Sequence, residues 1–324
     1  MQQSITGWLW GAWLILCWAC ANAQPAPVLI LKSREGALYE PVVQSLVNEL
    51  KRKTPDLNPP IFSLTGSKTD AEIVRNLLER KPRVIVAIGT DAALQLKQHT
   101  HSLPESQRPI VVFTMVLDPV ALGLVPGAEQ SDSHFVGVAL TVRPQRQFRA
   151  LLDVAPQARR IGVVYNPNDA TSTRLIQQAR DDAEKLGIQL VEASATKPEE
   201  VPQALNALKN QIDAFWLIPD PVCAAPQPFQ QIQAFVSERK LPLVAFSDSY
   251  VRRGALMAVG PDLAEQGVLA AELVQQILDD TPAETLPLLI PRRQLSYYNT
   301  AQARRIGIAI PDMLLNLAEK VFDQ

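Results

Sequence analysis

Three aspartates stand where a carboxylate could do chemistry. Asp118, Asp220 and Asp248 each lie at the end of an apolar run that is typical of a buried strand. A pair of carboxylates could act as acid and base on a glycosidic bond, and a single one could hold a ligand ammonium group in a partly dry cleft. Pro119 and Pro221 follow two of them, which is also the pattern of a helix N-cap with proline at the first helical position. Both interpretations stay open.

Two further loops have a similar double interpretation. Gly89-Thr90 could offer backbone N–H groups and a hydroxyl to a ligand carboxylate at a helix start, or simply form a tight turn and cap. Asn166 opens the run Asn-Pro-Asn-Asp, which could equally be a turn and cap or a ligand contact. Tyr250 is the aromatic side chain that we expect to stack on a ligand, whereas Phe246 is expected to point into the core.

Motifs of several enzyme classes are missing. The sequence contains no G-x-x-x-x-G-K-[ST], no G-x-G-x-x-G after its first strand, no H-E-x-x-H and no G-x-S-x-G. His99 and His101 could chelate a metal from an extended chain, but the only acid nearby is Glu105, so we predict a solvated loop and no metal site. Cys223 has no His partner and is expected to be a small buried hydrophobe. We therefore expect no cofactor and no catalytic residue. An exported enzyme that uses the cleft aspartates is the alternative of a different class.

Charge and length narrow the class of protein further. The 324 residues carry 31 Lys and Arg against 33 Asp and Glu, for a formal net charge of −2. This balance leaves no basic field for a phosphate backbone, so nucleic-acid binding is not expected. The length suits roughly two domains of about 150 residues each.

The first residues have the features of an export signal. Residues 8–23 carry no charge and are shorter than the stretch of about 20 residues that spans a membrane. They end in Ala21-Asn22-Ala23, so residues 1–23 are predicted to be a signal peptide cut after Ala23. No Lys or Arg precedes the apolar stretch, which leaves an uncleaved anchor as the alternative. Export together with a single remaining thiol, Cys223, suits a bacterial periplasm.

Apolar, strand-like runs alternate with helical stretches along the rest of the chain, as in α/β folds with parallel sheets. The order starts again about 133 positions later, since Val28 corresponds to Ile161 and Pro109 to Pro242. We predict two similar doubly wound α/β lobes of four strands each, with ligands at the carboxyl ends of the strands in the cleft between them. The expected strands are 28–31, 61–64, 84–88, 110–115, 161–165, 189–193, 214–218 and 243–246, followed by a helix over 264–278, a strand over 288–290 and a helix from Pro311.

Five stretches in order resemble a known family. AIGTDAALQL (87–96), RPIVVFTMVLDPVALGLV (108–125), residues 135–169, residues 241–267 and YNTAQARRIGIAIPDMLLNLAEKV (298–321) are similar to ABC-transporter substrate-binding proteins, which include tryptophan- and tyrosine-binding lipoproteins. The resemblance implies a type I periplasmic-binding-protein fold. Lobe 1 would comprise 24–141 and about 260–284, and lobe 2 would comprise 142–259 and about 285–324.

The resemblance also implies a ligand held between lobes that close by a hinge. By position it indicates Gly89, Thr90, Asp118, Asn166, Asp220 and Asp248, to which we add Tyr250. For an aromatic amino acid, Asp220 or Asp118 would hold the ammonium group, and Thr90 with the Gly89 loop the carboxylate. Leu117 and Pro221-Val222-Cys223 stand where the family usually has polar residues, so a larger or more apolar ligand fits equally well.

The sequence thus predicts a periplasmic solute-binding protein that acts as a monomer. It would deliver a small ligand to the membrane permease of an ABC transporter or to another membrane receptor. A carrier of an apolar or lipid-like ligand and a sensory binding subunit are the alternatives within the binding class.

Overall fold

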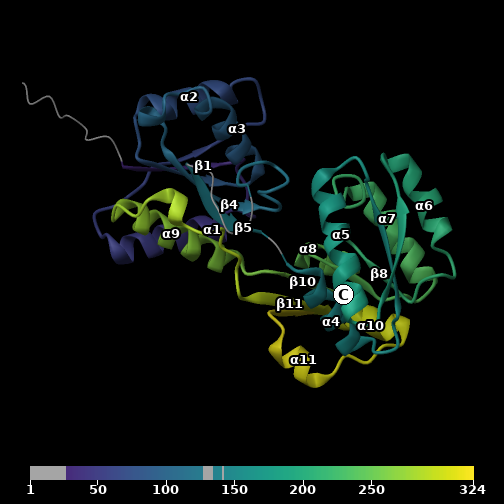
Figure 1. The fold of residues 1–324 in the computed structure, drawn as a ribbon. Coiled ribbons are helices and arrows are strands. Elements are labelled where there is room, and N and C mark those ends of the chain that lie inside the picture. The colour runs from purple at the N-terminus through teal and green to yellow at the C-terminus, as the bar shows by residue number, and fades with distance from the viewer. Residues whose placement is uncertain (1–26, 127–133, 141) are drawn as a thin grey trace, which may run out of the picture.

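The computed structural model describes residues 27–126, 134–140 and 142–324, so the predicted signal peptide (1–23) lies outside the described residues. Within these ranges, no helix is both long and apolar enough to cross a membrane. The chain forms two α/β lobes, and the C-terminal elements lie on the second (Figure 1). The prediction of two lobes with parallel sheets is confirmed.

The first lobe is built on a parallel sheet with helices on both faces. Among the described residues the sheet has five strands in the order β2-β1-β3-β4-β5. Alternate residues of β1 enter two different cores: Val28 and Ile30 pack toward α1 and α9 (Leu263–Leu278), whereas Leu29 and Leu31 pack toward α2 and α3. The elements are β1 (Val28–Lys32), α1 (Glu40–Lys53), β2 (Ile61–Ser63), α2 (Asp70–Glu79), β3 (Val84–Ile88), α3 (Thr90–Thr100), β4 (Ile110–Val116) and β5 (Phe135–Ala139).

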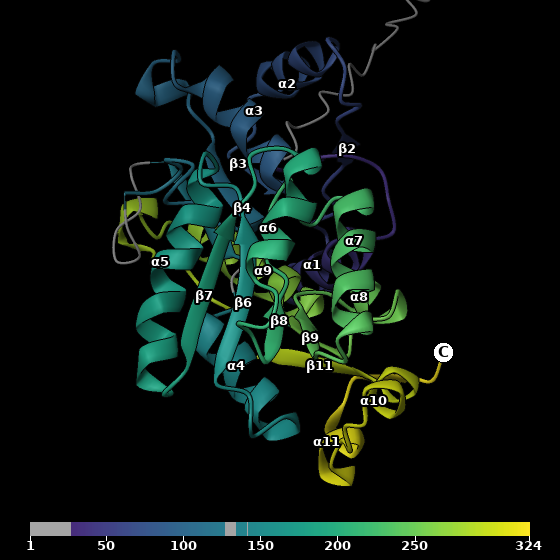
Figure 2. The same ribbon diagram turned by 90° about the vertical axis from the view of Figure 1, so that its right-hand side faces the viewer.

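The second lobe repeats this plan with a larger sheet. Its seven strands in the described chain run in the order β12-β11-β10-β9-β8-β6-β7, and only the β10–β11 pair is antiparallel. The elements are α4 (Pro144–Val154), β6 (Arg160–Tyr165), α5 (Ala170–Lys185), β7 (Gln189–Ser194), α6 (Val201–Ala207), β8 (Ala214–Trp216), α7 (Pro226–Glu238), β9 (Leu243–Ala245), α8 (Asp248–Arg252), β10 (Met257–Pro261), β11 (Gln294–Asn299), α10 (Thr300–Ile306), α11 (Asp312–Leu317) and β12 (Lys320–Phe322). Figure 2 shows α5, α6 and α7 beside strands β6 to β9.

The chain passes between the lobes more than once. It leaves the first lobe after β5, and returns after β10 as α9 (Leu263–Leu278), which packs along α1 (Figure 1). A Cβ added at Gly267 would lie 2.3 Å from the carbonyl oxygen of Val42, so only glycine allows the two helices to pack this closely. After α9, Leu286 packs in the core of the first lobe before the chain enters β11.

Most expected elements are present, and the differences have physical reasons. The strand expected over 288–290 is only an isolated bridge between Leu289 and Val138. The expectation of four strands in each lobe was too low, because β5, β10, β11 and β12 complete the sheets. β5 is a fully buried five-residue run, and such a run has no alternating pattern to distinguish it from other apolar segments.

Candidate ligand-binding site

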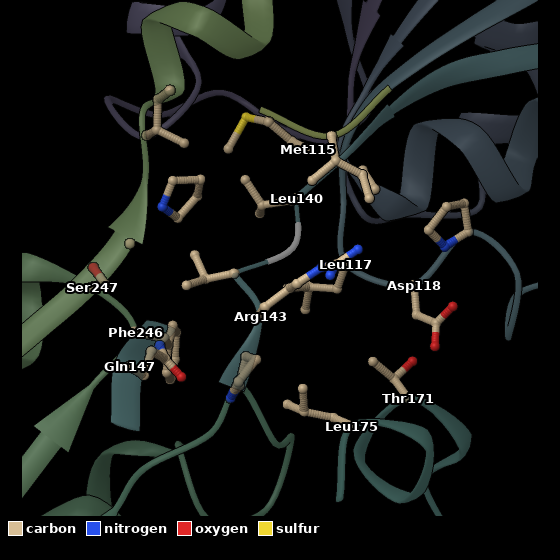
Figure 3. Close-up of a pocket in the computed structure, with 18 of the residues that line it drawn as sticks. Met115, Leu117, Asp118, Leu140, Arg143, Gln147, Thr171, Leu175, Phe246 and Ser247 are labelled. Atoms are coloured by element: carbon tan, nitrogen blue, oxygen red, sulfur yellow. The ribbon is translucent and has the colours of Figure 1, made fainter. Parts of the chain in front are cut away.

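A cavity of about 560 Å³ lies between the lobes. Its volume is within the range of small-molecule sites, and both lobes contribute to its walls. Figure 3 shows Met115, Leu117 and Leu140 on one side, and Leu175 and Phe246 on the other. The polar and charged side chains that also line it are Asp118, Arg143, Gln147, Thr171, Arg174, Gln178, Ser247, Asp248, Ser249, Tyr250 and Tyr297.

The first-lobe wall is formed where β4 ends in an irregular backbone. The pairing of β4 with β5 shifts register between Phe113 and Val116, and Met115 has a φ of 57°. A left-handed conformation at a non-glycine residue costs energy and persists only where the surroundings hold it. Here it re-aims the end of the strand, so that Met115, Leu117 and Asp118 all line the cavity.

The side chain of Gln266 on α9 holds this irregular strand end. Its Oε1 accepts hydrogen bonds from Thr114 Oγ1 (2.7 Å) and from the backbone N–H of Met115 (3.3 Å). Its Nε2 donates to the carbonyl oxygen of Ala139 at the end of β5 (2.9 Å). Because Gln266 is fully buried, these bonds replace water at both strand ends that border the cavity.

Asp118 links the two lobes. One carboxylate oxygen accepts from the backbone N–H of Ala121 (2.9 Å). Residues 119–123 form turns and not a helix, so the expected helix N-cap at Asp118-Pro119 was wrong and the aspartate caps a turn. The other oxygen lies 3.3 Å from Nε of Arg174 on α5 of the second lobe. Thr171, Arg174, Leu175 and Gln178 recur at helical spacing, so one face of α5 forms the opposing wall.

The start of α4 supplies two more cavity residues. Arg143 is the N-cap of this helix, with Pro144 in its first turn. Gln147 is buried, and both ends of its amide are paired: its Oε1 accepts from Trp216 Nε1 (2.7 Å) and its Nε2 donates to the carbonyl oxygen of Val259 (2.9 Å). Gln147 therefore fixes the start of α4 to the core of the second lobe.

Aromatic side chains cover the remaining wall. Tyr250 packs against Phe246, with ring centroids 4.9 Å apart, and donates its hydroxyl to the carbonyl oxygen of Ala224 (2.9 Å). Burial, reinforced by the nearby carboxylate of Asp248, raises the pKa of Tyr297 to about 12. The Tyr297 hydroxyl therefore stays protonated at neutral pH and can donate a hydrogen bond.

Comparison with known proteins identifies the family. Residues 62–322 match the model of the ABC transporter substrate binding protein family, which covers most of the chain. The chain belongs to this family. A tyrosine-binding protein from Clostridioides difficile (strain R20291) is 26% identical over 220 residues, which are 68% of this chain and 61% of that protein. The chain thus spans less than two thirds of the length of this relative.

Two solved structures have the same fold as this substrate-binding protein. A ligand-free, open substrate-binding protein with adhesive properties from Clostridium difficile has a TM-score of 0.76 and 23% identity, over 92% of this chain and 99% of that one. An ABC domain in complex with L-Trp from Streptococcus pneumonia has a TM-score of 0.71 and 21% identity, over 91% and 99% of the two chains.

The cavity of the substrate-binding protein includes three of the seven residues that the sequence indicated. Asp118, Asp248 and Tyr250 line it, together with Phe246, which also packs against the core of the second lobe as expected. Gly89 and Thr90 are not among the lining residues. Gly89 has a φ of 96°, and a Cβ there would meet Ser33 Oγ at 2.5 Å, so this glycine serves a tight turn before α3.

Asp220 and Asn166 belong to the framework behind the cavity of the substrate-binding protein. The Asp220 carboxylate is buried and accepts from Ser172 Oγ (2.7 Å) and from the backbone N–H groups of Asn166, Val222 and Cys223 (2.8 Å each). These four donors occupy all the acceptor sites of the carboxylate, so Asp220 has none left for a ligand. The Asn166 side chain accepts from the backbone N–H of Asn168 (3.0 Å).

The sequence did not indicate Met115, Arg143, Gln147, Arg174 or Tyr297. The helical spacing of Thr171, Arg174 and Gln178 was a usable signal, because it places three polar residues on one face of a helix that starts at the cleft. The expected solvated loop around His99 was wrong, since His99 lies inside α3, with Nδ1 2.8 Å from the carbonyl oxygen of Gln95. Among the described residues, no three His, Cys, Asp or Glu side chains come together as a metal site.

Proposed function

We propose that this protein captures a small, largely apolar ligand between its lobes and delivers it to the permease of an ABC transporter. The observation that carries the proposal is the cavity of about 560 Å³ whose walls come from both lobes. Such a site is completed only when the lobes approach each other, so ligand binding selects the closed arrangement. A membrane partner can then distinguish the loaded protein from the empty one.

Aromatic amino acids are the first ligands to test. One relative is named as a tyrosine-binding protein, and one structure of the same fold is in complex with L-Trp. The cavity offers the Phe246 and Tyr250 rings beside aliphatic side chains. We propose Asp118, Asp248 and Tyr250 as ligand contacts, and we assign Gly89, Thr90, Asn166 and Asp220 to the loops that support them.

A more apolar ligand is the second candidate. Leu38 and Ile290 line the cavity and are 59% and 41% exposed, so the apolar wall continues toward solvent. Exposed apolar side chains at the rim suit a ligand longer than an amino acid.

We further propose that the protein is no enzyme, acts as a monomer in the periplasm after loss of residues 1–23, and has the lobe division expected from the sequence. Binding requires no bond to form or break. The two carboxylates in the cavity each pair with an arginine, which suits an anchoring role better than proton transfer.

Isothermal titration calorimetry with L-tyrosine and L-tryptophan tests the proposal on protein that starts at Gln24 and has been unfolded, dialysed and refolded. We expect one ligand per chain. Trp216 is the one tryptophan after residue 23, and its Nε1 bonds to the cavity residue Gln147, so its emission should change on binding. The absence of heat and of any emission change with both amino acids would contradict aromatic amino-acid capture.

A further inference from the structure

The charged side chains that line the cavity differ in whether they already have an ion-pair partner within the protein. Of the described lining residues, two are acidic and two are basic. Both acids already hold an arginine of the protein: Asp118 lies 3.3 Å from Nε of Arg174, and Asp248 lies 3.0 Å from a terminal nitrogen of Arg252. The carboxylates are therefore neutralised locally.

Arg143 is the remaining charged side chain. Its guanidinium has no hydrogen-bond or ion-pair partner among the residues that the structure describes. Figure 3 shows the side chain extending into the cavity from the start of α4. Arg143 is also solvent-accessible, so an incoming ligand can reach it. A fixed cation without a partner in a ligand cavity is a binding position for an anion.

The backbone that carries Arg143 is held firmly on both sides of α4's first turn. The N–H of Gln145 donates to Asp182 Oδ2 (3.2 Å), and the side chain of Gln147 bonds to Trp216 and to the backbone at Val259. The backbone position from which the Arg143 side chain extends is thus fixed relative to the second lobe. A preorganised anchor loses less entropy on binding than a mobile one.

The surroundings of Arg143 strengthen its attraction for an anion. Met115, Leu117, Leu140 and Leu175 lie around the same space in Figure 3. When the lobes close on a ligand, these apolar side chains would exclude water from the space, and a charge pair is worth more where the local dielectric is low. The planar guanidinium matches a carboxylate with two parallel hydrogen bonds.

We propose that the ligand is a carboxylate with an apolar body, that Arg143 binds this carboxylate, and that no ammonium group is needed. The inference rests on the proposed capture of a ligand in this cavity, and it specifies the ligand's chemistry. Arg143, which lies at the junction of the two lobes, would then make the protein bind acids in preference to amines.

Three probes that share one ring test this inference by calorimetry. 3-(4-Hydroxyphenyl)propionate carries only the carboxylate, tyramine only the ammonium group, and L-tyrosine both. We expect the propionate to bind and tyramine to bind at least tenfold more weakly. In Arg143→Gln, the dissociation constant of the propionate should rise about ten- to a hundredfold, as expected for a lost charged hydrogen bond. Arg143→Lys should recover part of the affinity, because it keeps the charge but not the fork.

Arg149→Gln is the matched control, since Arg149 lies exposed on the same helix and does not line the cavity. Its affinity for the propionate should equal that of the wild type. Tyramine binding as tight as the propionate, binding of L-tyrosine without the propionate, or an Arg143→Gln variant with wild-type affinity would overturn the inference and leave ligand capture standing. If none of the three probes binds, capture of an aromatic ligand fails as well.

Discussion

Asp118 and Arg174 form an ion pair across the cleft, with Oδ2 of the aspartate 3.3 Å from Nε of the arginine. Asp118 follows β4 in the first lobe, and Arg174 lies on α5 of the second. Asp118 is also fixed by its bond to the N–H of Ala121. The pair therefore connects a rigid turn of one lobe to a helix of the other, and it stabilises arrangements in which the lobes are close.

Removal of this pair should favour the open arrangement. Arg174 is 57% exposed, so the pair is worth at most about 1 kcal/mol. Arg174→Gln should shift the ratio of closed to open protein by up to about fivefold, with a larger radius of gyration in small-angle X-ray scattering. High salt should produce a similar shift in the wild type by screening.

Arg180→Gln is the control for this experiment, because Arg180 lies on the same helix but pairs with Glu192 inside the second lobe. It should scatter like the wild type. Identical scattering from Arg174→Gln and the wild type at low salt would show that the ion pair does not affect the lobe arrangement.

Replacement of Gln266 should lower the free energy of unfolding by more than the loss of one side chain of its size would suggest. Replacement by Ala leaves the hydroxyl of Thr114, the N–H of Met115 and the carbonyl of Ala139 without their buried partner. A buried polar group without a partner costs about 1–3 kcal/mol, so we expect the free energy of unfolding in urea to fall by about 2 kcal/mol or more. Gln276→Ala, exposed on the same helix, should change it by less than about 0.5 kcal/mol. Equal effects of the two substitutions would contradict this role.

Asp220→Asn separates a framework role from ligand contact. Three of the four donors to Asp220 are backbone N–H groups that cannot turn away from the new amide. We expect a loss of about 1–3 kcal/mol in unfolding free energy, with the affinity for L-tyrosine unchanged in the folded fraction. Loss of affinity at unchanged stability would instead support the ammonium site that the sequence indicated.

Cys223 should be unreactive in the folded protein. Burial raises the pKa of its thiol well above the usual range, and the Asp220 carboxylate raises it further. Only the thiolate attacks disulfides, so a raised pKa lowers the reactive fraction at any given pH. We expect slow reaction with 5,5′-dithiobis(2-nitrobenzoate) at pH 8 and full reaction in guanidinium chloride. A Ser67→Cys variant, exposed at that position, provides the fast control. Rapid labelling of native Cys223 would contradict its burial.

The strands and helices that the sequence predicted best are those with a strong local pattern. β1, β3 and β4 are apolar runs bounded by polar turns, and the helix over 264–278 is almost coincident with α9. α4 was missed although Phe148, Leu151 and Val154 recur at helical spacing, because polar residues fill most of its other positions. β11 was missed because its first four residues are only partly buried and every residue except Leu295 is polar or aromatic with a hydroxyl, so it has no apolar run.

The candidate site was harder to predict, because its residues meet only through the arrangement of the lobes. Asp118 could be predicted as a site residue, because it follows the end of a predicted strand. Arg143 lies on the crossover between lobes, and Arg174 lies inside a helix, so neither occupies a strand end. Asp220 does follow a strand, yet its carboxylate turns to backbone donors of its own loops, and sequence spacing does not encode this rotation.

Native mass spectrometry tests the central claim, that the cavity between the lobes holds the ligand. The protein that starts at Gln24 would be compared with Leu140→Trp, which places a bulky ring in the cavity where the ligand would lie, and with Leu94→Trp, which adds the same side chain at a partly exposed position outside it. Both variants would first be shown to unfold cooperatively. After incubation with L-tyrosine and 3-(4-hydroxyphenyl)propionate, we expect a single bound small molecule on the wild type and on Leu94→Trp, and none on Leu140→Trp. Equal binding by Leu140→Trp, or no bound molecule on the wild type, would contradict the claim.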